Sequence, residues 1–143
     1  MKTIVASGFF DPLHSGHLEY LSKAKDLGDY LIVLVNSNEA AQRKKGFYFM
    51  DQAERMKIIQ SLKFVDEVLL AIDHDGTVAT SLQQIKPAIF AKGGDRTIDN
   101  LPIEEITVCQ TCHIEIVTGL GHKIQSSSNL INNYRHNHAV CSD

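Results

Sequence analysis

The sequence predicts a single α/β domain built on a mostly parallel β-sheet, and three observations support this fold class. Five short apolar runs alternate with segments whose apolar residues recur at helical spacing, which is the pattern of strands joined by helices. A length of 143 residues is that of one domain with one core. The composition, 43% hydrophobic and 22% charged, is ordinary for a globular protein, so the chain has enough apolar residues to form that core.

The strands are predicted from the short apolar runs. In order, they lie at 3–7, at 30–35, within 65–72, at 88–91 and at 114–117. The turn Asp73-His-Asp-Gly76 follows the third run, a loop at 92–96 follows the fourth, and a loop at 118–125 follows the fifth. These runs are long enough for strands of a sheet that is buried on both faces.

The helices are predicted from apolar stripes and from residues that start or stop a helix. They are expected at 16–27, from Asp51 onward, at 78–85 and from about Pro102 onward. The stripe of the first helix consists of Leu18, Leu21, Ala24 and Leu27. Asp51 has the position of an N-cap, with Glu54 three residues later. Pro87 ends the third helix, and Pro102 suits the first turn of the fourth. Residues 36–50 are expected to form a long loop.

Composition and charge exclude several classes of protein. The net charge of −3 argues against a nucleic-acid partner. No apolar run approaches 18 residues, so neither a signal peptide nor a membrane span is expected, and the predicted location is cytoplasmic. Three cysteines, an odd number, fit a reducing compartment. Cys109-x-x-Cys112-His113 has no second ligand pair, so a metal or redox centre is not expected there. Residues 132–143 are expected to be a polar tail.

The string G-F-F-D-P-L-H-S-G-H at 8–17 follows the first predicted strand and opens the first predicted helix. The first N–H groups of a helix have no partner inside it and carry partial positive charge, so this turn is suited to a phosphate. His14 and His17 are three residues apart and can share one face of the first turn. Two imidazoles beside unpaired amides suit a pentacoordinate phosphorus. A lone H-x-x-H more often has no such role, but the complete string is far more specific.

Parallel sheets bind ligands beyond the carboxyl ends of their strands, where the strand order reverses. Four predicted loops meet there, at 8–15, 36–50, 92–96 and 118–128. The second contains Arg43-Lys44-Lys45-Gly46, which by itself fits a solvated basic loop but also suits the charge of a triphosphate. Arg55, in the next helix, is placed to help. The serines at 126–128 fit either an N-cap cluster or a second helix terminus that binds phosphate.

The chain from residue 1 to about residue 131 resembles the cytidylyltransferase-like nucleotidyltransferases, whose signature is H-x-G-H. It is similar to glycerol-3-phosphate cytidylyltransferases and more so to heptose-1-phosphate adenylyltransferases. The matching segments are the string at 8–17, G-D-Y-L-I-V-L-V-N-S at 28–37, K-K-G at 44–46, E-R at 54–55, V-D-E-V at 65–68, K-P-A-I-F-A-K-G-G-D at 86–95 and S-S-S at 126–128. The resemblance implies a Rossmann-like sheet of five parallel strands with helices on both faces, Mg²⁺ bound through a nucleoside triphosphate, and a homodimer.

The same resemblance assigns roles to individual residues. Those implied in catalysis are His14, His17, Lys45 and Asp11. Those implied in binding the nucleotide and its phosphates are Gly8, Phe9, Phe10, Gly16, Lys44, Arg55, Lys92, Gly93, Gly94, Asp95, Lys123, Ser126, Ser127 and Ser128. By itself, Asp11 equally fits a turn residue that hydrogen-bonds its own backbone, and the segment 93–95 fits a plain turn. No metal ligand is assigned within the chain.

Two positions depart from the family pattern. Gly121-His122-Lys123-Ile124-Gln125 precedes the serines where the cytidylyltransferases have an arginine, so phosphate binding there would depend on Lys123, His122 or the helix end. Asn38 stands where relatives more often have an aspartate. Both departures bear on the substrate more than on the type of reaction.

The predicted reaction is transfer of a nucleoside monophosphate from ATP or CTP to a small phosphorylated sugar or polyol, with release of pyrophosphate. ATP and a sugar phosphate are favoured because Lys92-Gly-Gly-Asp95 and Asn36-Ser37 look more like the adenylyltransferases. CTP with a glycerol-3-phosphate-type acceptor is the alternative. A nucleotide-binding module without turnover is a further alternative, since a fold does not fix a function.

Overall fold

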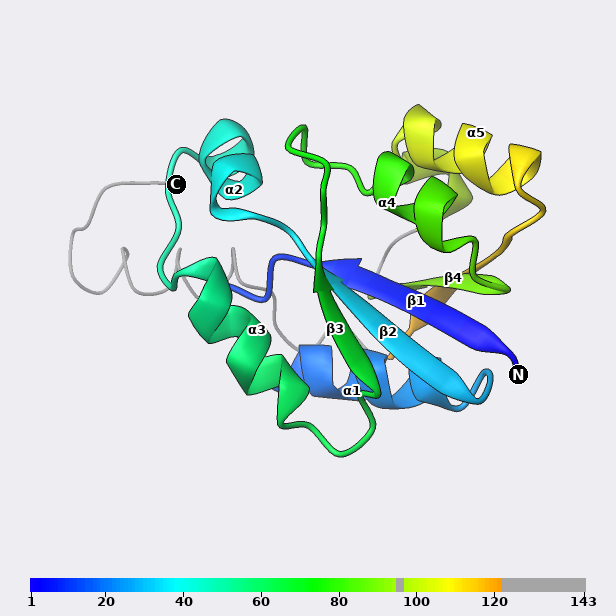
Figure 1. Ribbon diagram of the computed structural model, residues 1–143, viewed down its shortest axis with the longest axis horizontal. Coiled ribbons are helices and arrows are strands. Elements are labelled where there is room, and N and C mark those ends of the chain that lie inside the picture. Colours follow the sequence, from blue (N-terminus) through cyan, green and yellow to red (C-terminus); the bar gives the residue numbers. More distant parts are fainter. Residues whose placement is uncertain (95–96, 122–143) are drawn as a thin grey trace.

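The computed structural model describes residues 1–94 and 97–121, and Figure 1 shows the arrangement of their helices and strands. The strands are β1 (Thr3–Gly8), β2 (Tyr30–Val35), β3 (Glu67–Leu70), β4 (Ile89–Gly93) and β5 (Glu115–Leu120). The helices are α1 (Ser15–Lys25), α2 (Asn38–Lys45), α3 (Gln52–Gln60), α4 (Ala79–Ile85) and α5 (Ile103–Thr111), with a 3-10 turn, η1 (Ile98–Asn100).

The five strands form one parallel sheet in the order β3-β2-β1-β4-β5, which confirms the predicted α/β fold. In the central strand β1, Ile4 pairs with Leu31 of β2 on one side and with Ile89 of β4 on the other. The chain leaves β1 toward β2 and returns later to place β4 on its other side. The order therefore reverses between β1 and β4, and the carboxyl ends of these two strands mark the expected place for a ligand.

Helices cover both faces of the sheet, as predicted. Successive residues of a strand point to opposite faces, so Ile4 and Val5 belong to different cores. Ile4 packs in the core with Leu21 of α1, and Ile59 of α3 belongs to the same core. Val5 packs in the core that contains Leu82 of α4 and Cys109 of α5. Figure 1 shows α1 and α3 on one side of the strands, and α4 and α5 on the other. In the described part of the chain, no helix is both long enough and apolar enough to cross a membrane.

The prediction of an uninterrupted loop at 36–50 was wrong, because this segment contains helix α2 (Asn38–Lys45). The Ser37 side chain caps the helix by accepting the N–H of Ala40, and three basic residues in the last turn complement the helix dipole. Gly46 ends the helix with φ 86°, a left-handed conformation that glycine adopts without strain. Only Ala40 and Ala41 are buried, so the helix has no wide apolar stripe by which the sequence could reveal it.

Other element boundaries differ by a few residues. Helix α1 begins at Ser15, one residue before the predicted start. Lys92 and Gly93, predicted in a loop, belong to β4, and residues 118–120 belong to β5, because the pairing of these two strands continues past an irregularity to Gly93 and Leu120. The predicted helix start at 126–128 and the polar tail at 132–143 lie outside the described residues.

Candidate active site

The turn after β1 brings the backbone from Gly8 to Phe10 to the carboxyl edge of the sheet. Phe10 has φ 53° and is 2% exposed, and its ring meets the His17 ring edge-on with centroids 5.0 Å apart. A Cβ added at Gly8 would lie 3.0 Å from the Phe10 ring, so glycine makes room for the ring to fold back over the end of the strand. This packing fixes the first turn of α1 against the sheet.

His14 and His17 hold each other in place through the backbone at the start of α1. His14 is the N-cap, and its Nδ1 accepts the N–H of Gly16 at 3.1 Å. His17 Nδ1 in turn accepts the N–H of His14 at 3.2 Å, so the two imidazoles form a reciprocal capping box. Because each Nδ1 is an acceptor, the hydrogen of each neutral ring is on Nε2. The Gly16 N–H, implied in phosphate binding, is thus bonded to His14.

The two imidazole rings stack with centroids 3.9 Å apart and an angle of 26° between their planes. Burial lowers the pKa of His14. Burial also lowers the pKa of His17 to about 3, and the nearby charges of His14 and Lys45 act in the same direction. Both rings are therefore neutral near pH 7. The Nε2 atom of His14 is buried, and the described residues give it no hydrogen-bond partner.

The basic end of α2 lies over the same turn. The Nζ atom of Lys45 is 4.5 Å from the centroid of the Phe9 ring, and that of Lys44 is 5.4 Å from it. Lys45 is also close enough to His17 to influence its pKa. The structure therefore brings both lysines, predicted from the sequence, to the turn that carries the histidine pair.

Arg55 lies behind this turn and is 0% exposed. Its Nη1 donates to the carbonyls of Phe9 and Asn36, both at 2.8 Å, and its Nε donates to the carbonyl of Met50 at 2.9 Å. A fourth bond runs from Nη2 to Asn38 Oδ1 at 2.9 Å. These four bonds brace the turn from behind, and a contact of Arg55 with phosphate stays a prediction.

Asp11 is also a brace and is 3% exposed. Its carboxylate oxygens accept the N–H groups of Phe49 and Met50 at 2.7 and 2.8 Å, so it ties the segment after α2 to the turn after β1. The sequence offered a bond to its own backbone as the alternative to a catalytic role. The observed partners lie 38 and 39 residues away, and a direct part of Asp11 in catalysis stays a prediction.

Asn38, the departure near the second strand, is half-buried and belongs to the same hydrogen-bond network. Its Oδ1 accepts from Arg55 and from the N–H of Gln52, and its Nδ2 donates to Asp51 Oδ1 at 2.9 Å. An aspartate could accept these bonds but could not donate the one to Asp51. Asn38 thus joins a cationic and an anionic neighbour.

The end of β4 lies beside the turn after β1. Lys92 Nζ donates to Ser7 Oγ at 3.3 Å, and its ammonium lies 5.2 Å from the centroid of the Phe90 ring. A Cβ added at Gly93 would come within 2.7 Å of the Tyr20 ring, so this glycine permits close packing of α1 on the sheet. Gly94 has φ 63°, which suits glycine. The remaining predicted binding residues lie outside the described residues: Asp95, Lys123, Ser126, Ser127 and Ser128.

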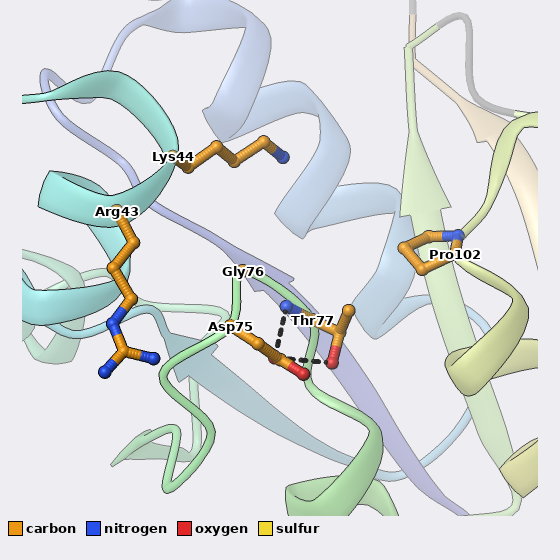
Figure 2. A pocket seen from close by; sticks show the side chains of 6 residues that line it. All are labelled: Arg43, Lys44, Asp75, Gly76, Thr77 and Pro102. Carbon is orange, nitrogen blue, oxygen red and sulfur yellow. Dashed lines mark hydrogen bonds between the residues drawn. The ribbon is translucent and has the colours of Figure 1, made fainter.

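A pocket of about 400 Å³ opens at the same edge of the sheet, and sequence reasoning missed it. We call it the Arg43 pocket, and Figure 2 shows the residues that line it: Arg43, Lys44, Asp75, Gly76, Thr77 and Pro102. The turn after the third strand was predicted only as a chain reversal. Its position at the carboxyl end of a parallel strand was the signal that it belongs with the other site loops.

Comparison with known proteins identifies a family and several relatives of this chain. The model of the cytidylyltransferase-like family matches residues 5–134. Bifunctional protein HldE of Geobacter metallireducens is 35% identical over 132 residues, which are 91% of this chain and 26% of that protein. FAD synthase of Ferroglobus placidus is 38% identical over 99 residues, which are 69% of this chain and 63% of that protein. The chain thus spans about a quarter of the first relative and under two thirds of the second.

Solved structures agree with the family match. The lipopolysaccharide core biosynthesis protein of Thermoplasma volcanium aligns with a TM-score of 0.71 and 31% identity over 85% of this chain and 98% of that one. Thermotoga maritima TmcAL, solved with alpha-thio ATP, aligns over 97% of this chain and 51% of its own with a TM-score of 0.73. Its identity of 16% shows a shared fold alone. From the match over residues 5–134 and these relatives, the chain belongs to the cytidylyltransferase-like family.

Proposed function

We propose that this protein is a nucleotidyltransferase that transfers the nucleoside monophosphate of ATP or CTP to a small phosphorylated sugar or polyol and releases pyrophosphate. The observation that carries the proposal is the buried Nε2 of His14, which has no partner among the described residues and belongs to a ring stacked on His17. Leaving a buried donor unpaired costs free energy, and Lys45 lies close enough to the stacked His17 ring to lower its pKa, so an anionic oxygen is favoured as the partner of this donor.

The chemistry follows from neutral donors and nearby cations. An oxygen of the acceptor's phosphate attacks the α-phosphorus in line and forms the new P–O bond. The bond from the α-phosphorus to the oxygen that bridges to the β-phosphate breaks, and its electron pair leaves with pyrophosphate. Nε2–H groups of His14 and His17, with the ammonium of Lys45, stabilise the charge that grows on the oxygens around the α-phosphorus. Positioning and charge stabilisation supply the rate, and no side chain forms a covalent intermediate.

The reaction also needs Mg²⁺, which we expect to be bound through the triphosphate. Asp11, three residues before His14, already accepts two backbone N–H groups. Within residues 1–94 and 97–121, no group of three or more His, Cys, Asp or Glu side chains is placed to hold a metal ion. An ion held by the oxygens of the triphosphate would need no such group, and there it would neutralise charge on the phosphates.

ATP is the favoured nucleotide. The FAD synthase relatives take their name from a product that contains adenine, and the resemblance to the adenylyltransferases points the same way. CTP with a polyol phosphate is the alternative within the same reaction.

A flavin phosphate is a second candidate acceptor, favoured by the FAD synthase relatives and by an aromatic segment beside the site. Phe49 is 59% exposed and its ring lies edge-on to that of Phe47, with centroids 5.2 Å apart. The backbone N–H of Phe49 is bonded to Asp11, which places this aromatic pair next to the turn after β1.

A pyrophosphate-release assay tests the proposal. The protein is incubated with Mg²⁺, with each of the four nucleoside triphosphates in turn, and with hexose 1-phosphates, glycerol 3-phosphate or flavin mononucleotide. Release that depends on one nucleotide and one acceptor supports a transferase and identifies the pair. Reactions without acceptor serve as the control for hydrolysis. Nucleotide binding without release under every condition would instead identify a binding module.

The partners expected from the sequence stay predictions. A homodimer is implied by the resemblance, and sedimentation velocity measures it directly. The expected lack of nucleic-acid binding, which rests on the net charge of −3, is tested by electrophoretic mobility with single- and double-stranded oligonucleotides.

A further inference from the structure

We propose that Tyr20 is a positioning residue for the nucleotidyl transfer, because its hydroxyl bridges the ends of β1 and β4 and ties both strands to the helix that carries His17. This inference rests on the function proposed above and assigns to that reaction a residue outside the string at 8–17. Tyr20 lies three residues after His17 in α1 and is 7% exposed. Its hydroxyl sets the place of the His17 ring relative to the strand ends beyond which the nucleotide binds.

The hydroxyl bridge lies where β1 and β4 stop pairing. Ala6 and Ala91 are the last paired residues of these two strands. The Tyr20 hydroxyl accepts the N–H of Ser7 at 3.2 Å and donates to the carbonyl of Ala91 at 2.5 Å. One side-chain oxygen therefore joins the strands at the point where their backbones no longer pair. The strand order reverses here, and parallel sheets bind their ligands at such a point.

The surroundings of Tyr20 hold this bridge in one place. A Cβ added at Gly93 would lie 2.7 Å from two atoms of the Tyr20 ring, so the ring packs directly on β4. Successive residues of a strand point to opposite faces, so the Ser7 side chain lies on the face away from α1. There Ser7 Oγ accepts from Lys92 Nζ of β4 at 3.3 Å. Ser7 is thus linked to β4 from both faces of the sheet, through Tyr20 and through Lys92.

Loss of the hydroxyl would disturb the site even if the ring stayed in the core. The N–H of Ser7 and the carbonyl of Ala91 would either remain unpaired, which costs free energy, or move together and narrow the gap between the strands. In the first case the strand ends lose their tie to α1, and in the second they move. Both displace His17 relative to the nucleotide, and a misplacement of about 1 Å can cost about 100-fold in rate.

Tyr20→Phe tests the role of the hydroxyl, because it removes one oxygen and keeps the ring. Initial rates of pyrophosphate release are measured with the best pair of substrates, each varied while the other is saturating. We expect kcat to fall about tenfold and both KM values to stay within about twofold, since His17 acts on charge that develops in the transition state. Circular dichroism at the assay temperature checks that the variant is folded.

Tyr30→Phe is the matched control. Tyr30 is the first residue of β2, and its hydroxyl donates to Glu67 Oε1 of β3 at 2.9 Å. It therefore also joins two strands, but at the opposite end of the sheet from the site. The control should leave kcat and both KM values unchanged. An equal fall of kcat in the two variants would mean that any lost hydroxyl bridge slows the enzyme, and it would overturn the positioning role.

A double variant separates positioning from a merely structural role. Tyr20→Phe is introduced into His17→Asn, which has no Nε2 donor left to position. If Tyr20 acts through His17, the further loss of kcat in this background should shrink to less than about twofold. A general loosening of the fold would lower kcat by the same factor in both backgrounds. A tenfold loss in each would therefore overturn the proposal.

The outcomes also separate this inference from the proposed function. An unchanged kcat in Tyr20→Phe, with an active parent, overturns the role of the hydroxyl and leaves the transferase standing. A raised nucleotide KM at unchanged kcat overturns it as well, because the hydroxyl would then serve substrate binding alone. If the parent releases no pyrophosphate with any acceptor, the proposed function fails, and the role of Tyr20 fails with it.

Discussion

The turn after β1 has two sides that differ in how their polar groups are hydrogen-bonded. We call the side of Arg55 and Asp11 the back, and the side of His14 and His17 the front. At the back, Arg55 is fully buried and makes four hydrogen bonds, and the buried carboxylate of Asp11 accepts two. At the front, each imidazole uses only Nδ1 on the backbone, and the buried Nε2 of His14 has no partner in the described part of the chain. Arg55 and Asp11 thus make their hydrogen bonds within the protein, although the buried Oδ1 of Asn36 beside them also has no partner among the described residues. At the front, the buried atom without a partner is the ring nitrogen of His14, a donor that a ligand oxygen could accept from.

The largest expected effect is on the back of the turn. Arg55→Ala would leave the carbonyls of Phe9, Asn36 and Met50 without their donor, so we expect the free energy of unfolding to fall by about 3–5 kcal/mol. Urea unfolding measures it. Arg43→Ala is the matched control, because the Arg43 side chain is 61% exposed and its surface pair with Glu39 should contribute at most about 1 kcal/mol. Equal losses in the two variants would contradict the bracing role.

At the front, the expected effect is on rate and not on stability. His17→Asn keeps an acceptor where Nδ1 now accepts the His14 N–H, but it removes the Nε2 donor. We expect kcat to fall about 100- to 1,000-fold, the usual loss for one preorganised donor to a charged transition state. His113→Asn, on an exposed histidine after α5, is the control. A kcat within threefold of the parent in His17→Asn would remove His17 from the mechanism.

The sequence predicted the front of the turn well because the signals for it are local. A strand, the histidines three residues apart and the basic run at 43–45 all lie in short stretches with recognisable spacing. Their meeting follows from one topological rule, that loops at the carboxyl ends of parallel strands share an edge. Helix α2 was missed because it buries only two alanines and therefore has no apolar stripe. Its cap residues were present in the sequence, but alone they did not indicate a helix.

The back of the turn and the Arg43 pocket were beyond sequence reasoning for a different reason. The direction of the Arg55 side chain depends on where the carbonyls of Phe9 and Asn36 point, and these lie 46 and 19 residues away. An arginine four residues after an N-cap gives the same sequence pattern whether its side chain points to solvent or into the protein. The pocket likewise combines residues of α2, of the turn after β3 and of the start of α5.

The pH dependence of stability offers a smaller effect that again separates front from back. Below pH 6.5 the unfolded chain takes up protons on its imidazoles, whereas burial keeps the folded His17 neutral down to about pH 3. The unfolded state then binds more protons, so the free energy of unfolding falls as the pH falls, by at most about 1.4 kcal/mol per pH unit for each imidazole. Urea unfolding between pH 6.5 and 4.5 measures the slope.

His17→Asn serves as the control for this slope and should flatten it, because the variant lacks the buried imidazole. A slope that is the same in parent and variant would contradict the buried, neutral state of His17.

The smallest expected effect concerns Asn38, where an attraction to Arg55 and a repulsion from Asp51 would change the stability in opposite directions. Asn38→Asp keeps both accepting bonds and adds a charge beside Arg55, but it sets a carboxylate oxygen against Asp51 Oδ1, which now receives the Nδ2 hydrogen at 2.9 Å. That bond is the largest cause of the lowered pKa of Asp51. We expect a net loss of stability at pH 7.5 that shrinks at acid pH as a carboxylate takes up a proton.

The double variant Asn38→Asp with Asp51→Asn tests this reasoning directly, because it reverses the pair and restores one donor facing one acceptor. It also keeps an N-cap residue before α3, since asparagine caps helices as well as aspartate does. We expect it to regain most of the lost stability and to lose the dependence on acid pH. If Asn38→Asp alone is as stable as the parent at pH 7.5, the attraction to Arg55 outweighs the lost donor, and the amide is not what this network requires.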